Sequence, residues 1–294
     1  MVSFSRKAHR VWDVVRWGLS ARVRKAPEES AFVGPTGGCD GQGLRRLIVV
    51  HSHRRSGTHF LIDTLRSRFE VAPDWFHLEE DFFARLIDAP VVIKSHERVW
   101  GEKICSDVPW QSYLHWVAAS ALYSSASHIH IVRDPRQVMR SQYYFDLKGH
   151  EPAYRISPDT RFADYVRARS ARDPQGHHSQ LSYWCAQVEA WSARPGVYQI
   201  RYEDLLSHPE RALDGLAQFL GLPQQREKWR SSTAIGRQTS ERQARAMPAH
   251  WGQAEEDWLQ ETARRFALPD LGYGLEAPTG ASPDFTPPLL AAGA

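Results

Sequence analysis

A glycine turn between arginine and hydroxyl side chains is the part of the sequence best suited to chemistry. Residues 53–60 are His-Arg-Arg-Ser-Gly-Thr-His-Phe and follow the apolar run Leu-Ile-Val-Val at 47–50. This pattern predicts a buried strand, a tight turn at Gly57 and a helix whose first backbone N–H groups point at an anion. The turn is not the G-x-x-x-x-G-K-[ST] loop of ATPases, because the first glycine and the lysine are missing. Taken alone, it fits an ordinary strand–helix connection equally well.

A second turn with the same kinds of side chains lies further along the chain. The apolar residues 129–132 lead to Arg133, Asp134 and Pro135, and Ser141 follows two helical turns after the proline. Proline is tolerated in the first turn of a helix, so a strand, a turn and a helix are expected here too. Ligands of open α/β sheets bind outside the carboxyl ends of the strands. The two turns are therefore predicted to bind two phosphates of one ligand; the alternative for Arg133 is a surface ion pair with Asp134 or another neighbour.

Together with two further segments, these turns resemble motifs of the bacterial type of PAPS-dependent sulfotransferases, where PAPS is 3′-phosphoadenosine 5′-phosphosulfate. Residues 55–58 resemble the family's 5′-phosphosulfate loop, and residues 132–141 resemble its 3′-phosphate motif. Residues 199–206 resemble its Tyr-Glu-Asp-Leu segment. Residues 93–96 resemble the Lys-Thr-His segment that carries the catalytic base in cytosolic-type members. The four motifs occur in the family's order over roughly residues 45–225.

The sequence departs from the family's pattern in three places. Arg55 stands where cytosolic-type members usually have lysine, although carbohydrate-type members have arginine there. His59 and Phe60 replace the usual Thr-Trp. The family's C-terminal Arg-Lys-Gly…Gly-x-Trp-Lys stretch is not recognisable, and only Arg242, Arg245 and Trp251 match it weakly. The second half of the 3′-phosphate site is therefore not assigned.

The resemblance implies that PAPS, and its product 3′-phosphoadenosine 5′-phosphate (PAP), bind along both turns. Arg55 would bridge two anionic oxygens with its guanidinium group. Phe60 would stack on the adenine, its alternative role being core packing, and Tyr202 would lie near the same ring. The implied donor-binding residues are Arg55, Ser56, Gly57, Thr58, His59, Phe60, Arg133, Ser141 and Tyr202. The resemblance implies no metal, and the sequence has no cluster with metal-ligand spacing.

Three residues are predicted to take part in catalysis. Sulfuryl transfer needs a positioned donor, charge stabilisation at the leaving phosphate and removal of the acceptor's proton. Arg55 and Lys94 are the candidates for the charge, although Lys94 also fits a solvated strand end. His96 is the candidate base, because an imidazole with a pKa near 6.5 accepts a proton near neutral pH. His59, which opens the predicted helix, and Glu97, since carbohydrate-type members use a carboxylate, are the alternatives.

Strands and helices alternate from residue 44 to about residue 225. Strands are predicted at 46–51, 91–95, 128–133 and 197–202, with helices between them and another at 252–266. This predicts an α/β fold with a mostly parallel central sheet and helices on both faces; the resemblance implies the P-loop NTPase-like sulfotransferase fold. The polar, turn-rich stretch 146–180 is expected to be a lid that shapes the acceptor pocket. The predicted units are an N-terminal helix and linker (1–43), a sulfotransferase domain (44–274) and a flexible tail (275–294).

Composition bounds the classes of function. The chain has 294 residues, of which 42% are hydrophobic and 24% charged, as is typical of a globular domain. A net charge of +3 gives no case for nucleic acid binding. The sequence has no apolar run of the ~18 residues that a membrane span needs. The three cysteines are widely spaced, which favours a reducing, cytoplasmic compartment.

Residues 6–25 are predicted to form a basic amphipathic helix. The first 25 residues hold seven Lys/Arg and one Asp, and Trp12 and Trp17 widen the apolar arc. Such a helix fits peripheral contact with a membrane interface. The same pattern slightly favours a helix that packs on the protein's own core or on a partner.

These observations predict an enzyme that transfers a sulfuryl group from PAPS to a hydroxyl or amine of a small-molecule, lipid or carbohydrate acceptor. One alternative is a P-loop kinase for a small molecule or nucleotide. The missing Walker lysine and the lack of an evident acidic strand end for Mg²⁺ count against it. The other alternative is a catalytically weak PAP- or PAPS-binding scaffold at a membrane surface, suggested by the degenerate C-terminal motif and the basic N-terminus.

Overall fold

The computed structural model describes residues 47–72, 75–77, 90–96, 98, 123–173, 176–225 and 251–275. Within these residues five strands form one sheet in the order β2-β3-β1-β4-β5, and every pairing is parallel. The strands are β2 (Trp75–His77), β3 (Val91–Ser95), β1 (Leu47–Ser52), β4 (Ser127–Val132) and β5 (Val197–Arg201). The parallel sheet predicted from the sequence is confirmed, and the three-residue edge strand β2 is an addition to it.

The central strand β1 delivers the glycine turn to the carboxyl edge of the sheet. All six residues of β1 are buried. The strand pairs with β3 on one side (His51 with Ser95) and with β4 on the other (His51 with His130). Because the three strands are parallel and in this register, the segments that follow Ser52, Ser95 and Val132 emerge side by side at one edge.

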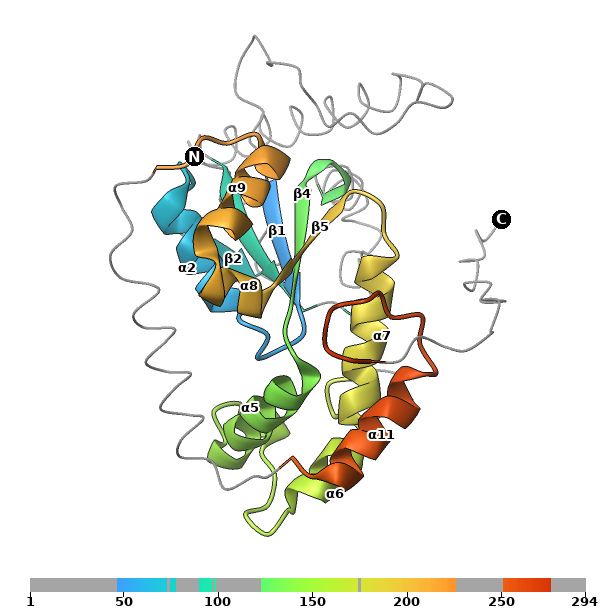
Figure 1. The fold of residues 1–294 in the computed structure, drawn as a ribbon. Coiled ribbons are helices and arrows are strands. Elements are labelled where there is room, and N and C mark those ends of the chain that lie inside the picture. The colour runs from blue at the N-terminus through green and yellow to red at the C-terminus, as the bar shows by residue number, and fades with distance from the viewer. Residues whose placement is uncertain are drawn as a thin grey trace, which may run out of the picture.

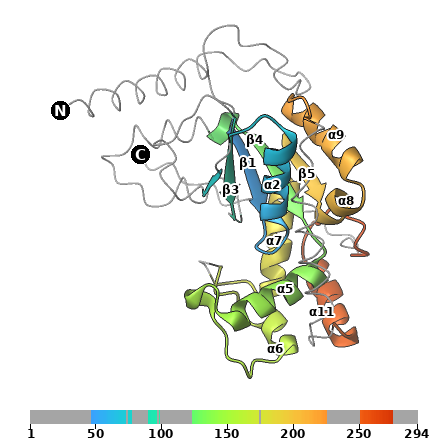
Figure 2. The same cartoon turned by 90° about the vertical axis from the view of Figure 1, so that its left-hand side faces the viewer.

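Helices cover both faces of the sheet, as predicted (Figure 1). Helices α2 (Thr58–Arg68), α8 (Tyr202–Ser207) and α9 (Pro209–Leu220) pack on one face, where their leucines share a core with the strands. Figure 2 shows these three helices together on one side of the sheet. Helix α7 (Gln180–Ser192) packs on the opposite face, and its Trp191 stacks on His51 of β1 with ring centroids 3.6 Å apart.

Three further helices lie beyond the carboxyl ends of the strands (Figure 1). They are α5 (Pro135–Lys148), α6 (Phe162–Arg167) and α11 (Gln253–Ala263). A second core joins them to α7, and Val138, Trp184 and Leu259 are fully buried in it. This group of helices borders the edge of the sheet at which ligands of α/β proteins bind.

The stretch 146–180 contains short helical elements between its turn residues. Helix α5 continues to Lys148, a 3₁₀ turn follows at Pro152–Tyr154, and α6 comes next. Arg172 and Asp146 form a buried ion pair of 2.6 Å that fastens the stretch to α5. The turn residues of the described part thus separate short packed elements, and the role of this stretch as a lid over the acceptor pocket stays a prediction.

Some sequence-based predictions fall outside the described residues. They concern the helix at 6–25, the linker to residue 43, the tail beyond residue 275, the alternative base Glu97, and Arg242 and Arg245. The boundaries of the three predicted units thus stay predictions. Among the helices that the structure describes, none combines the length and the apolar character that crossing a membrane requires.

Candidate active site

One cavity at the carboxyl edge of the sheet gathers the predicted site residues. Its volume is about 260 Å³. Of the predicted residues, it is lined by Arg55, Gly57, Thr58, His59, Phe60, Lys94, His96, Arg133, Ser141 and Tyr202. Ser56 is fully buried in the turn and does not line the cavity. The remaining wall consists of Arg54, Gln142, Phe145, Glu151 and Arg172, which sequence reasoning did not single out.

The turn after β1 is shaped by two residues with positive φ. Gly57 has a φ of 95° and lies at the start of α2. A Cβ atom at this position would lie 2.3 Å from Cδ2 of Tyr202, so glycine is required for the tyrosine ring to reach the turn. Arg55 has a φ of 68°, which is uncommon for a residue other than glycine and is typical of functional sites. The first N–H groups of α2 have no partner inside the helix and are available to an anion.

The two predicted phosphate-binding arginines are linked to each other. Arg55 donates from Nε to Oγ of Ser141 (3.1 Å), and its guanidinium lies 4.7 Å from the ring centre of Phe145. Arg133 donates from Nη1 to the backbone oxygen of Arg55 (3.3 Å). Burial, followed by the nearby charge of Arg133, lowers the pKa of Arg55. Two guanidinium groups thus share one partly enclosed space, an arrangement that an anion would stabilise.

Arg133 does not form the surface ion pair with Asp134 that was its alternative role. Its Nε and Nη2 donate to Oε1 of Gln137 (3.2 and 2.8 Å), and the guanidinium lies 4.4 Å from the ring centre of Tyr202. Asp134 instead caps α5, accepting from the backbone N–H of Arg136 (2.8 Å). Gln137 and Tyr202 therefore hold the guanidinium of Arg133 at the cavity.

His96 has its ring orientation fixed by β1. Its Nδ1 lies 2.8 Å from the backbone oxygen of Ser52 and 3.2 Å from the Ser52 hydroxyl. A carbonyl oxygen only accepts, so Nδ1 carries the proton and Nε2 of the neutral ring keeps its lone pair. Burial, then the charges of Lys94 and Arg54, hold the pKa of His96 well below its usual 6.5. The imidazole is therefore neutral at neutral pH, and the expectation of a pKa near 6.5 is wrong for the free protein.

Lys94 and His59 contact each other at the cavity rim. Nζ of Lys94 lies 3.3 Å from Nε2 of His59 and 5.3 Å from the ring centre of Trp75. A lysine ammonium only donates, so Nε2 of His59 accepts from it. The lone pair that a base would need is thus engaged in His59 and available in His96, which favours His96 as the base.

Phe60 and Tyr202 form the part of the cavity that was predicted to bind adenine. Their rings meet edge to face, with centroids 5.6 Å apart. Both residues line the cavity, and Phe60 also packs against the core of the sheet face that carries α2. Phe60 thus packs on the core and also borders the cavity, while its stacking on adenine stays a prediction.

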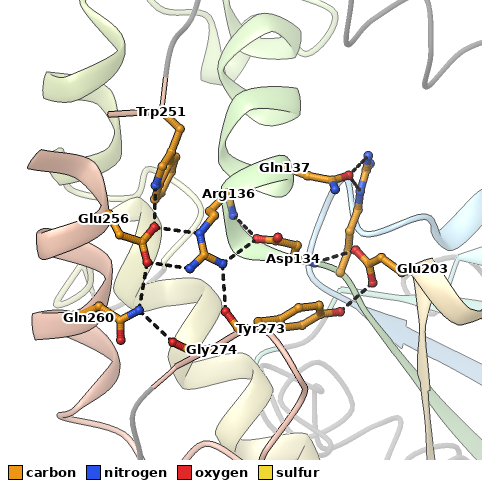
Figure 3. A network of polar contacts seen from close by, with 10 residues as sticks. Asp134, Arg136, Gln137, Glu203, Trp251, Glu256, Gln260, Tyr273 and Gly274 are labelled. Carbon is orange, nitrogen blue, oxygen red and sulfur yellow. Dashed lines mark hydrogen bonds and ion pairs between the residues drawn. The ribbon is translucent and has the colours of Figure 1, made fainter. Parts of the chain in front are cut away.

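A polar network fastens the turn that carries Arg133 to the C-terminal part of the described chain (Figure 3). Glu203, in the first turn of α8, accepts from the backbone N–H of Asp134 (3.0 Å) and from the hydroxyl of Tyr273 (2.8 Å). One carboxylate therefore joins the end of β4, the start of α8 and the loop after α11.

Arg136 extends this network to α11. It donates to both carboxylate oxygens of Glu256 (2.8 and 2.6 Å) and to the backbone oxygen of Tyr273 (3.1 Å). Hydrogen bonds from Arg136 are the main cause that lowers the pKa of Glu256 to about 2. Trp251, one residue of the degenerate C-terminal motif, donates from its indole N–H to Glu256 (3.0 Å) and so belongs to this support.

Comparison with known proteins agrees with the geometry. Residues 45–254 match the model of the sulfotransferase domain family. This match spans most of the chain and every residue that lines the cavity, so the protein belongs to the sulfotransferase domain family and is a sulfotransferase. The predicted sulfotransferase family and its α/β fold are thereby confirmed, and the bacterial type stays a prediction.

Among solved structures, the chain is similar to mouse sulfotransferase SULT7A1 complexed with PAP. The identity is 17%, the match covers 69% of this chain and 68% of that chain, and the TM-score is 0.42. No curated protein matches the sequence.

Proposed function

We propose that the protein transfers the sulfuryl group of PAPS to a hydroxyl or amine of a small-molecule, lipid or carbohydrate acceptor. The observation that carries the proposal is the meeting, in one cavity, of Arg55 and Arg133 with an imidazole that is neutral and keeps Nε2 free. They supply two of the functions that the reaction needs, namely positive charge for an anionic donor and a base for the acceptor.

The donor would lie along the two linked turns. Arg133 and Ser141 would bind the 3′-phosphate. Arg55, Thr58 and the start of α2 would bind the 5′-phosphosulfate, and Tyr202 would lie beside the adenine. The gathering of positive charge supports this arrangement, because Arg55, Arg133 and Lys94 all line the cavity. Guanidinium groups suit this role, since each can bind two anionic oxygens at once.

In the proposed reaction, His96 takes the proton of the acceptor's O–H or N–H group at Nε2. The acceptor atom then forms a bond to sulfur, and the bond between sulfur and the 5′-phosphate oxygen breaks. The electron pair of that bond stays on the phosphate, where Arg55 and Lys94 stabilise the added charge. The products are the sulfated acceptor, PAP and a proton that His96 later passes to solvent. Ser52 keeps the ring in the tautomer that leaves Nε2 unprotonated.

Transfer of sulfur-labelled sulfate from PAPS to an acceptor mixture tests the proposal. We expect labelled product and PAP in equal amounts, and no transfer of the γ-phosphate from labelled ATP. Phosphoryl transfer from ATP would establish the kinase alternative. Binding of PAP without any transfer would establish the scaffold alternative. Among the described residues, His, Cys, Asp and Glu form no group of three or more that could hold a metal ion. Running the assay with and without a chelator tests whether the reaction needs a metal.

A further inference from the structure

The cavity has a second polar wall, built by residues that the donor and the base do not use. Arg54, Gln142, Glu151 and Arg172 line it. They come from the turn after β1, the middle of α5, the segment after α5 and the segment before α7. We call these four residues the distal wall.

The distal wall is held by a buried ion pair. Arg172 donates to both carboxylate oxygens of Asp146 (2.9 and 2.6 Å), and the side chains are 4% and 1% exposed. The hydroxyl of Tyr165 donates to Asp146 as well (2.7 Å). The ring of Tyr154 packs 4.1 Å below the guanidinium of Arg172. A buried pair with this many partners is costly to disturb, so it gives the wall a fixed shape.

Two oxygen atoms of the distal wall have no hydrogen-bond partner in the described protein. Glu151 accepts from Arg54 at Oε1, while its Oε2 is buried without a hydrogen bond and has Arg172 Nη2 at 3.5 Å. Gln142 is fully buried; its Nε2 donates to Gln180 (3.1 Å) and its Oε1 has no partner. Buried polar atoms in proteins are almost always hydrogen-bonded. Nε of Arg172 in the same wall is also buried without a partner. Two acceptors and one donor therefore indicate a ligand whose groups both donate and accept, as hydroxyl groups do.

The distal wall lies beside the base. Arg54 comes two residues after Ser52, which binds His96, and Arg54 and His96 line the same cavity. The charge of Arg54 is one of the causes that lower the pKa of His96. An acceptor whose hydroxyl reaches Nε2 of His96 consequently presents its neighbouring groups to Arg54 and Glu151.

The charges of this region cancel. Arg54 and Arg172 balance Glu151 and Asp146. With Asp146 behind it, the distal wall has no net charge and attracts neither an anionic nor a cationic acceptor over a neutral one. Its hydrogen-bonding groups favour a polar acceptor over an apolar one, since an apolar surface would leave the two oxygens unsatisfied.

We propose that the acceptor is a neutral polyhydroxylated compound of the sugar type. Hydroxyl groups adjacent to the reacting one donate to Oε2 of Glu151 and to Oε1 of Gln142, and accept from Arg54. This inference rests on the proposed function, because it places the acceptor opposite His96.

Kinetics with labelled PAPS test the inference on the full chain, using a methyl hexoside, a simple phenol and a long-chain alcohol as acceptors. We expect the hexoside to have the highest kcat/KM. Gln142→Met and Glu151→Ala should each raise the KM for the hexoside on the order of 10-fold, the size of one buried hydrogen bond. Glu261→Ala is the matched control, because Glu261 forms the same kind of pair with Arg265 on an exposed helix surface. It should leave the KM unchanged.

The affinity for PAP distinguishes failure of the acceptor inference from failure of the proposed function. Both distal-wall variants should bind PAP as the parent protein does, which also shows that they are folded. If PAP binds and the phenol or the alcohol is the better acceptor, the acceptor inference is overturned and the proposed function stands. The same holds if no hexoside is sulfated, or if both variants keep the parent KM. If PAP does not bind the parent protein, the proposed function itself fails.

Discussion

Nδ1 of His96 lies 2.8 Å from the backbone oxygen of Ser52, and this contact leaves Nε2 as the free nitrogen of the neutral ring. Replacement of the ring should therefore remove the base without removing the donor site. We expect His96→Ala to lower kcat on the order of 10²- to 10⁴-fold, with the affinity for PAP unchanged. Steady-state kinetics and PAP titration measure the two effects. His59→Ala, beside the same cavity, should reduce kcat far less; the opposite ranking would transfer the role to His59.

The pH profile of the parent enzyme tests the state of the same ring. The kcat/KM of an enzyme reports ionisation in the free protein. Since burial and neighbouring cations hold the pKa of His96 well below 6.5, the fall of kcat/KM in acid should lie below the pH at which an ordinary imidazole is protonated. A fall centred near pH 6.5 to 7 would show that the ring has an ordinary pKa in the free enzyme and would contradict this account of its surroundings.

Arg133 and Arg55 should affect different kinetic constants. Arg133 would bind a phosphate that does not react, so Arg133→Ala should raise the KM for PAPS by about 10- to 100-fold, the value of a charged hydrogen bond. Arg55 would stabilise charge that grows at the leaving oxygen, so Arg55→Ala should mainly lower kcat. Arg161→Ala, at an exposed pair with Asp164, is the control. Small and equal effects of the two cavity variants would contradict both assignments.

Tyr273 should position Arg133 without touching the donor. Its hydroxyl donates to Glu203, which in turn holds the backbone N–H of Asp134. Tyr273→Phe should weaken PAP binding about 3- to 10-fold, the value of one hydrogen bond of ~1 kcal/mol, and leave kcat at saturating PAPS unchanged. Tyr198→Phe on β5 serves as a hydroxyl-removal control. A change in the melting temperature alone, with the affinity for PAP intact, would reduce Tyr273 to a structural role.

Buried histidines should make the fold acid-sensitive. Burial is the first cause that lowers the pKa of His53 and His130 to about 3 and of His128 to about 4. These values lie below the unfolded value of 6.5, so the unfolded chain binds more protons, and stability is complete above pH 6.5 and lost as the pH falls toward about 3. At pH 5 each such residue costs about 2 kcal/mol of unfolding free energy.

Urea unfolding at pH 7.5 and pH 5 measures this loss. His130→Gln should reduce the difference between the two pH values, because one buried proton acceptor is gone. His150→Gln removes an exposed histidine and should leave the difference unchanged. A parent protein that is equally stable at both pH values would contradict the burial of these imidazoles.

The sequence determines the strands and the two turns more readily than the walls of the cavity. Short apolar runs in the sequence predict β1, β3, β4 and β5. Because the strands are parallel, their carboxyl ends are expected at the same edge of the sheet. Strand β2 has three residues and too short a pattern to detect. The partners Arg54 and Glu151 are 97 residues apart in sequence, and no local pattern links them. Ser52 orients His96 through its backbone oxygen. Every residue has such an oxygen, so the amino-acid type at position 52 could not predict this role.

Calorimetric titration of the parent protein with PAP and with ATP tests the central claim most directly. The account predicts one PAP bound per chain and an affinity for ATP at least about 10-fold weaker, because ATP lacks the 3′-phosphate that Arg133 and Ser141 would bind. Arg133→Ala should bring the affinity for PAP close to that for ATP. Equal or tighter binding of ATP by the parent protein, or failure to bind PAP, would contradict the assignment of this cavity as the donor site.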